Sequence, residues 1–308
     1  MTLSSLFRFI KVGVEMLINW YPGHMKKTKE LIQANLKLVD VVVELLDARI
    51  PISSRNPQID DLVGNKPRVV LLNKYDLCDQ RVLKDWVNYY KEKGIVAIPI
   101  NSITGDGVKH LLKQIKVETK PLVDKMIERG RVPRAIRMMI VGIPNVGKSS
   151  LINKLVGKKA TRTGNKPGVT KGKQWIRVRD DIELFDTPGI LWPKIDDQLA
   201  ARNLAYTGAI NDDTLVIEDI GFFLVERLMT TYPDVMKKRY QLEMDFDDVE
   251  AIQIVDAIAD FKNFYDRSKD VDYNRVAKLV INDFRSGRLG HITLERPEEL
   301  KDRGYEGN

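Results

Sequence analysis

Cysteine is almost absent from this sequence of 308 residues, which contains only Cys78. One thiol cannot form an internal disulfide, so a disulfide-rich secreted scaffold is excluded and a reducing compartment is favoured. A lone cysteine can also be a catalytic nucleophile, but no obvious base such as histidine lies beside Cys78 in the sequence. We therefore assign it no catalytic role.

Long apolar runs are also missing. The first residues, MTLSSLFRFIKVGVEML, are interrupted by Arg8, Lys11 and Glu15, and no segment approaches the roughly 20 apolar residues that cross a bilayer. No small-residue cleavage site follows, which argues against a signal peptide. The segment is either a short leading helix or the product of a start codon set too early, with Met16 as the true first residue, and we favour the second. We expect a cytoplasmic protein with no membrane partner.

Acidic residues are absent from residues 129–179, a stretch that contains 14 Lys and Arg. The whole chain has 50 basic and 43 acidic residues, so the remainder, with 36 basic residues and all 43 acidic ones, is net negative. A basic region of this kind is typical of a surface that faces a polyanion. The phosphates of a bound nucleotide would need only a few of these charges. We therefore favour an additional RNA surface, and we expect no DNA partner.

The sequence does contain a regular alternation of strand and helix patterns up to about residue 190. Short apolar, β-branched runs occur at residues 39–48, 67–74, 94–101, 135–142, 174–179 and 181–186, and helical spacings occur at 79–94, at 105–120 and from Lys148. This alternation predicts a mainly parallel α/β sheet with helices on both faces. After Leu191 only helical periodicities follow, at 196–210, 221–232, 248–264 and 272–289, and they predict a second, all-helical domain.

The segment GIPNVGKSS, at residues 142–150, matches the phosphate-binding pattern G-x-x-x-x-G-K-[ST]. It follows a predicted strand and opens a predicted helix, which is the context that the motif requires. Its glycines permit a turn whose N–H groups surround phosphates, Lys148 can reach the β- and γ-phosphates, and Ser149 offers a hydroxyl to Mg²⁺. The predicted contacts of this loop are Asn145, Val146, Gly147, Lys148, Ser149 and Ser150.

The segment FDTPG places Asp186 at the end of a strand and Gly189 three residues later. A carboxylate there can hold Mg²⁺ through water, and the Gly189 N–H can reach a γ-phosphate. The pattern D-x-x-G is common, but its position two strands after the phosphate loop favours this role. In the polar loop between them, Thr170 is expected to complete the Mg²⁺ shell, and the alternative is an ordinary basic loop.

The segment NKYD, at residues 73–76, ends another predicted strand, at the sheet edge where α/β proteins bind ligands. The carboxylate of Asp76 can accept hydrogen bonds from the N1–H and 2-amino groups of guanine, which adenine lacks. Asn73 would brace the loop, and the stem of Lys74 would lie over the base. After the next strand, the Ser102 N–H is expected to bind the guanine carbonyl oxygen. The predicted ligands are therefore GTP and GDP, and the predicted base contacts are Asn73, Lys74, Tyr75, Asp76, Asn101 and Ser102.

These five elements run in the order base, base, phosphate, switch, switch, whereas the phosphate loop comes first in an ordinary GTP-binding domain. Order and motifs together resemble the circularly permuted TRAFAC-class GTPases. The stretches NWYPGHMKK, DARIPISSRNP, GNKPGVTKGKQW and DTPGILWPK resemble a bacterial branch of that family that assembles the large ribosomal subunit. The resemblance runs from about Trp20 to near the chain end and is looser in the helical half.

The resemblance implies a P-loop GTPase domain with permuted strand order at residues 20–195, preceded by an extension at 1–19. It also implies an all-helical, RNA-binding domain at residues 196–308. The expected activity is GTP hydrolysis stimulated by the large (50S) subunit, which the protein would bind through 23S rRNA late in assembly and leave after hydrolysis. A second interpretation is a GTP-gated RNA-binding switch in another pathway, such as tRNA modification, with incidental hydrolysis.

Many GTPases carry a glutamine directly after the D-x-x-G glycine to orient the attacking water, but this chain has Ile190 there. The resemblance offers His24 as the substitute, alongside Lys148 and Thr170 as catalytic groups. His24 has the alternative of contacting rRNA or packing locally. The resemblance also assigns Asn145 to a K⁺ ion that would stabilise charge between the phosphates.

Other polar residues are expected to have structural or RNA-binding roles. Asp47 and Arg49 close a strand and are expected to form a structural ion pair rather than to catalyse. Near the chain end, four basic residues could contact phosphates or line a solvated helix face: Arg275, Lys278, Arg285 and Arg288. Because the switch at residues 186–190 leads directly into the helices, a change there could reorient the helical domain.

Overall fold

The computed structural model describes residues 35–157, 175–185 and 197–304. The predicted roles of His24, Thr170, Asp186 and Gly189, and the N-terminal extension, fall outside these residues. Within them, no helix is both long enough and apolar enough to cross a membrane.

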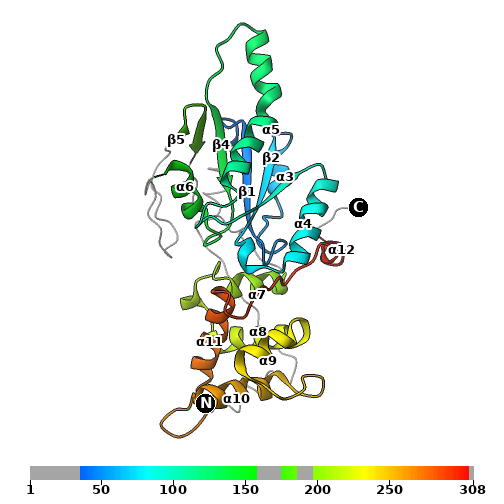
Figure 1. Cartoon of the computed structure of the whole chain (residues 1–308), viewed down its shortest axis with the longest axis vertical. Helices are drawn as coiled ribbons and strands as arrows, with labels where there is room; N and C mark the ends of the chain where they lie inside the picture. The colour runs from blue at the N-terminus through cyan, green and yellow to red at the C-terminus, as the bar shows by residue number, and fades with distance from the viewer. Residues whose placement is uncertain (1–34, 158–174, 186–196, 305–308) are drawn as a thin grey trace.

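A six-stranded sheet lies in the upper part of the molecule, in the spatial order β3-β2-β1-β4-β6-β5 (Figure 1). Its strands are β1 (Val41–Asp47), β2 (Arg68–Asn73), β3 (Val96–Ile100), β4 (Ile136–Val141), β5 (Trp175–Arg179) and β6 (Ile182–Phe185). All neighbouring strands pair in parallel except β5 and β6, which pair in the antiparallel sense at one edge. The predicted, mainly parallel sheet is confirmed.

Successive residues of β2 point into two different layers of helix, as strand geometry requires. Leu71 belongs to a core that includes α5 (Val108–Glu128) and α6 (Lys148–Val156). Leu72 belongs to a separate core that includes α4 (Gln80–Glu92). Helices therefore cover both faces of the sheet, which explains why most residues of the central strands are apolar.

Helix α5 is longer than its sequence pattern indicated. The predicted range ended at residue 120, but the helix continues through Pro121 to Glu128. Leu122 and Val123 pack against the main core, and this burial offsets the backbone hydrogen bond that Pro121 cannot donate. The end of α5 projects beyond the sheet (Figure 1).

The lower part of the molecule is helical, as predicted. It contains α7 (Gln198–Tyr206), α8 (Ile217–Thr231), α9 (Pro233–Tyr240), α10 (Ala251–Lys262) and α11 (Tyr273–Arg285). Helix α9 was not predicted because eight residues are too few to show a periodicity, although Pro233 at its start is a helix signal. Helices α8 and α11 pack closely at Gly221, where a Cβ atom would lie 2.4 Å from the Cβ of Ala277.

After α11 the chain returns to the sheet. The Ile292 N–H donates to the Leu77 carbonyl (3.0 Å), and the Leu294 N–H donates to the Arg49 carbonyl (2.8 Å). Leu300, on the short helix α12 (Glu299–Asp302), packs in the α4 core. The tail at residues 292–304, which the sequence grouped with the helical domain, therefore lies against the α/β part.

Candidate nucleotide-binding site

The predicted phosphate loop connects β4 to α6. Neighbouring atoms lie so close to its glycines that a side chain would not fit there. A Cβ atom on Gly142 would lie 2.6 Å from the Leu45 carbonyl oxygen, and one on Gly147 would lie 2.3 Å from Asn73 Nδ2. Gly147 has a φ of 108° and Asn145 a φ of 57°, both in the left-handed region. The loop thus has the tight conformation that exposes backbone N–H groups to a phosphate.

Lys148 lies at the start of α6, and its side chain turns back into the phosphate loop. Its Nζ donates to the carbonyl oxygens of Gly142 (2.9 Å) and Ile143 (2.6 Å). Ser149 and Ser150 follow in the first turn of α6, where the positive end of the helix dipole favours an anion. The Lys148 ammonium is therefore held by carbonyl oxygens of the phosphate loop itself.

Asn73, at the end of β2, joins the base loops to the phosphate loop. Its Nδ2 donates to the Val146 carbonyl (2.6 Å) and to Ser102 Oγ (3.1 Å). Its Oδ1 accepts a hydrogen bond from the Ser102 N–H (3.0 Å). Three segments far apart in the sequence meet at this one buried side chain, in the bracing position that the sequence indicated.

The bond to Asn73 corrects the role assigned to Ser102. We expected the Ser102 N–H to bind the guanine carbonyl oxygen, but this hydrogen is directed to Asn73 Oδ1. Asn101 shapes the same loop, because its Oδ1 accepts from the N–H groups of Ile103 (2.9 Å) and Thr104 (3.0 Å). Ser102 thus supports the base site, and the sequence could not show which acceptor would take its N–H.

Asp76 is exposed at this edge of the sheet, in the short 3-10 helix Tyr75–Leu77. The neighbouring Tyr75 hydroxyl donates to the Asp106 carboxylate, which raises the pKa of Tyr75 and ties the two base loops together. Lys74 adopts a left-handed conformation, and its Nζ donates to Asp47 Oδ2 (2.8 Å) and to the Asn145 carbonyl (3.3 Å). The Lys74 head group is thereby held between the base loop and the phosphate loop.

The expected ion pair of Asp47 and Arg49 is present, and it is completely buried. Arg49 Nε donates to Asp47 Oδ1 (2.9 Å), and Arg49 Nη2 donates to Oδ2 (2.8 Å). Burial alone would raise the pKa of Asp47, but Arg49 and Lys74 together hold it well below its usual range. Burial is also the main reason that the pKa of Lys74 is lowered, and Asp47 opposes that shift.

Replacing Asp47 by asparagine should lower the free energy of unfolding by about 3–5 kcal/mol, because the buried Arg49 and the half-buried Lys74 would lose their counter-charge. The pKa of Asp47 is depressed in the folded state, so its contribution is present above the unfolded pKa of about 4 and is lost as pH falls further. Urea unfolding should therefore give a constant difference between wild type and Asp47→Asn from pH 5 to 8. The exposed substitution Asp61→Asn is the control, and a difference that shrank between pH 8 and 6 would contradict the assignment.

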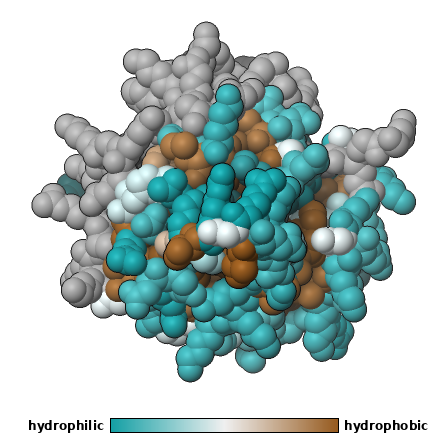
Figure 2. Space-filling view, turned by 90° about the horizontal axis from the view of Figure 1, so that it is seen from above, coloured by the Kyte–Doolittle hydropathy of each residue, from teal (hydrophilic) through white to brown (hydrophobic). Residues whose placement is uncertain are grey.

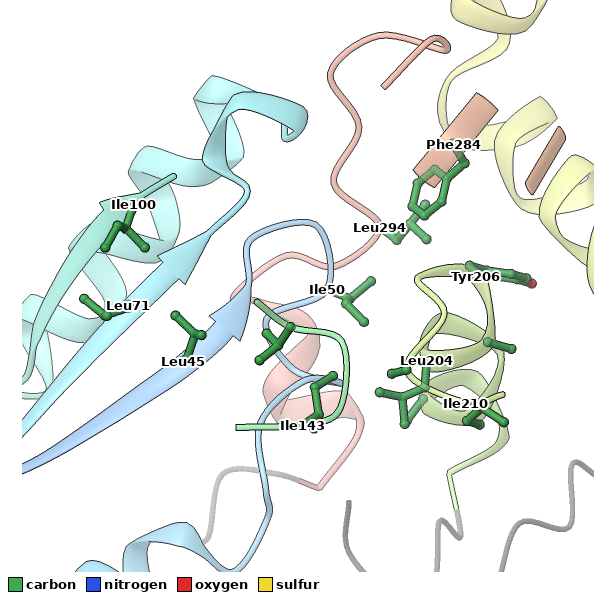
Figure 3. Close-up of a cluster of buried hydrophobic side chains, with 14 of the residues drawn as sticks. Leu45, Ile50, Leu71, Ile100, Ile143, Leu204, Tyr206, Ile210, Phe284 and Leu294 are labelled. Atoms are coloured by element: carbon green, nitrogen blue, oxygen red, sulfur yellow. The ribbon is translucent and has the colours of Figure 1, made fainter. Parts of the chain in front are cut away.

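The phosphate loop and the residues that follow β1 lie directly against the helical part of the molecule. Asn145 Nδ2 donates to the Gly208 carbonyl (2.7 Å), just after α7. Arg49 Nη1 donates to the Phe284 carbonyl (3.3 Å), and its guanidinium lies 5.0 Å from the centre of the Phe284 ring. Figure 3 shows Ile50 and Ile143 facing the α7 side of this boundary, in the main core that runs from the sheet into the helices.

Arg285 fixes the end of α7 rather than serving as a free phosphate contact. Its guanidinium donates to the carbonyl oxygens of Ala205 (2.7 Å) and Tyr206 (2.9 Å) and pairs with Asp212. Arg288 pairs with Asp283 (2.5 Å). Two of the four predicted RNA-facing residues are thus engaged within the protein, whereas Arg275 and Lys278 are exposed.

Comparison with known proteins shows the family. A model of a family described as "50S ribosome-binding GTPase" matches residues 137–245. The match begins in β4 and leaves out the base loops, as expected when they precede the phosphate loop. The curated Ribosome biogenesis GTPase A of Bacillus cereus is 47% identical, over 92% of this chain and 96% of its own. The chain belongs to the ribosome biogenesis GTPase A family.

More distant members of the family are also similar over nearly the whole length of this chain. The Ribosome biogenesis GTPase A of Thermotoga maritima is 31% identical over 92% of this chain and 96% of its own. A crystal structure of GNP-bound YlqF from Thermotoga maritima is similar with a TM-score of 0.62 and 28% identity, covering 88% of this chain and 99% of that one. The predicted permuted GTPase fold with a helical C-terminal part is confirmed, and the chain is a GTPase.

Two features of the site were missed from the sequence. Asp47 was expected to pair with Arg49 alone, yet it also holds Lys74, and this contact follows from the register of β1 and β2, which places Asp47 opposite Asn73. Glu295 was not singled out, although its buried carboxylate accepts from the Ser53 backbone (2.9 Å) and Asn203 (2.8 Å). Cys78 is buried, and burial raises the pKa of its thiol to about 12, in keeping with the absence of a catalytic role.

Proposed function

We propose that this GTPase binds the large (50S) ribosomal subunit through 23S rRNA, acts in a late step of its assembly in the cytoplasm, and leaves after GTP hydrolysis. The observation that carries the proposal is the Asn73 side chain bonded to both Val146 and Ser102, because it joins the predicted base loops to the predicted phosphate loop in a permuted chain. Membership of a family named for ribosome biogenesis supplies the pathway. The excess of basic residues in the sequence from 129 to 179 is of the kind that suits a partner with a phosphate backbone.

Magnesium fits the residues of the site. Ser149 offers a hydroxyl oxygen in the first turn of α6, and Mg²⁺ in such sites is held by one or two protein oxygens together with phosphates. In the part of the chain that the structure describes, no group of three His, Cys, Asp or Glu forms a metal cage. Ser149, Thr170 and, through water, Asp186 would hold the ion, which would neutralise charge on the β- and γ-phosphates.

The catalytic groups of the proposal are Lys148, Thr170 and His24, with Asp76 and Gly189 in nucleotide binding. Ile190 cannot orient a water molecule, so intrinsic hydrolysis should be slow and the imidazole of His24 is the proposed substitute. Asn145 is the proposed K⁺ ligand. Its Nδ2 donates to Gly208, which leaves Oδ1 as the atom able to accept a cation.

We further propose that the nucleotide controls the position of the helices. Asn145 belongs to the phosphate loop and bonds to Gly208, while Lys74 of the base loop is linked through Asp47 and Arg49 to Phe284. The first route ends just after α7 and the second ends on α11. A nucleotide that shifts either loop would therefore disturb a bond to the helical part. We expect GTP and GDP, which would hold these loops differently, to favour two different positions of the helices relative to the sheet.

The proposal is tested by hydrolysis and binding with purified large subunits. Turnover of GTP should rise at least about tenfold when subunits are added, because binding to the subunit would bring the catalytic groups into position. A non-hydrolysable GTP analogue should retain the protein on subunits in sucrose gradients, and GDP should release it. The small subunit is the matched control. Unchanged turnover together with no GTP-dependent comigration would overturn the proposal and favour an RNA switch in another pathway, such as tRNA modification.

A further inference from the structure

Helix α5 carries a row of lysines along one side. Lys109, Lys113, Lys116 and Lys120 recur at intervals of four, three and four residues, which places them on one flank of a helix. All four are exposed. The side of α5 that packs on the sheet is formed by other residues, namely Leu111, Leu112, Ile115 and Thr119.

The row leads to a group of arginines at the projecting end of the helix. Arg129, Arg131 and Arg134 lie in the connection between α5 and β4, and all three are exposed. Figure 2 looks down on this end of the molecule, where hydrophilic side chains gather around a few apolar ones. We name the row and this group together the α5 basic surface: Lys109, Lys113, Lys116, Lys120, Arg129, Arg131 and Arg134.

Four of these seven cations are available to a partner. Lys116 pairs with Asp181 (2.6 Å), Lys120 with Asp124 (2.5 Å) and Arg134 with Asp40 (2.7 Å). Among the described residues, no ion pair is formed by the other members of the surface, Lys109, Lys113, Arg129 and Arg131. The remaining acidic residues of α5, Glu118 and Glu128, fall outside the lysine row by helical spacing.

The bound nucleotide does not explain most of this charge. The nucleotide loops follow the carboxyl ends of β2, β3 and β4, whereas the arginines at residues 129–134 precede the amino end of β4. In a parallel sheet these are opposite edges. The α5 basic surface extends about 30 Å from Lys109 to Arg129, at 1.5 Å per residue. Only its first members therefore lie near the end of the sheet that carries the nucleotide loops.

We propose that the α5 basic surface binds the phosphate backbone of ribosomal RNA, an inference that rests on the function proposed above. Cations spaced along an exposed helix suit a regular line of phosphates, which position a protein without reading sequence. A protein partner would be expected to use buried apolar anchors. The exposed apolar residues here, Val117, Ile127 and Val132, are scattered along the helix and its connection instead of forming one patch.

The test replaces the four available cations in the full chain by glutamine: Lys109→Gln, Lys113→Gln, Arg129→Gln and Arg131→Gln. The probes are purified large subunits and their deproteinised rRNA, with binding measured between 50 and 200 mM salt. Loss of four phosphate contacts should make the slope of log affinity against log salt shallower by about 3 to 4. Affinity for both probes should fall about 10- to 100-fold at the lower salt concentrations. GTP affinity and hydrolysis without subunits should stay at wild-type values, which also verifies folding.

The matched control removes four cations from α4 and its end, on the opposite face of the sheet: Arg81→Gln, Lys84→Gln, Lys91→Gln and Lys93→Gln. It has the same net charge and should bind both probes like wild type. Equal weakening by the two variants would reduce the effect to net charge and overturn the proposal. A defect seen on subunits but not on deproteinised rRNA would identify an acidic ribosomal protein as the partner, and would overturn it as well. Failure of the wild type to bind either probe would instead overturn the proposed function itself.

Discussion

Replacing Asp76 by asparagine should convert the protein from guanine to xanthine nucleotides. In our proposal the carboxylate accepts two hydrogen bonds from guanine, and hydrogen bonds to a charged group contribute about 1.5–3 kcal/mol each. Affinity for GTP should therefore fall on the order of 10²- to 10⁴-fold. Xanthine carries an oxygen in place of the 2-amino group, so the asparagine amide can donate to it, and XTP binding should rise. Equilibrium titration with labelled GTP and XTP measures both changes.

The control for this exchange is Asp85→Asn, the same chemical change on the exposed face of α4. It should leave both affinities at wild-type values. Hydrolysis should follow binding, so Asp76→Asn should turn over XTP at saturating concentration at a rate close to that of wild type with GTP. Guanine selectivity that survived the substitution would refute the assignment of Asp76 as the base-reading residue.

Replacing Gly147 by alanine should lower both the stability of the protein and its affinity for GTP. The added Cβ would lie 2.3 Å from Asn73 Nδ2 and 2.9 Å from Ser102 Oγ, and φ at this position is 108°. Neither neighbour can move freely, because both belong to the bracing network of the base loops. We expect the free energy of unfolding to fall by about 2–4 kcal/mol. GTP affinity should fall at least about 100-fold, as measured by titration alongside urea unfolding.

Gly157 offers a matched control at the other end of the same helix. It also has a positive φ, of 70°, but a Cβ atom there would meet nothing within 4 Å. The substitution Gly157→Ala should cost only about 1 kcal/mol of backbone strain and leave GTP affinity unchanged. If the two alanine variants lost GTP binding equally, the cause would be general strain in α6 and not the collision with Asn73.

The short motifs predicted the strand, loop and helix around the phosphate loop well, because each motif encodes a local conformation. The glycines of residues 142–147 and the strand before them specify a phosphate loop wherever they stand in the chain. Asn73 was expected to brace the base loop, and its bonds to Val146 and Ser102 agree with that expectation. The motifs also predicted the permuted order, since a parallel sheet brings all its carboxyl ends to one edge regardless of where the chain begins.

What the sequence could not predict depends on contacts between distant segments. The Ser102 N–H had two possible acceptors, guanine and Asn73, and only the fold shows that Asn73 Oδ1 is within reach. The stem of Lys74 was expected over the base, and only the fold shows that its charged end is held by the buried Asp47. Arg285 looked like a basic surface residue, and it turned out to hold the carbonyl groups at the end of α7. In each of these cases the local sequence allows several hydrogen-bond partners, and the packing of distant segments determines which partner is used.

The returning tail at residues 292–304 has a consequence for how the protein can be taken apart. The Glu295 carboxylate is held by Ser53, Asn203 and Arg303, and the Trp86 indole donates to the Glu295 carbonyl (3.0 Å). A chain cut after the sheet would lose these partners and expose the α4 core, so the catalytic half is not a module that can be expressed alone. The tail at residues 292–304 thus couples the stability of the α/β part to that of the helical part that precedes the tail in the chain.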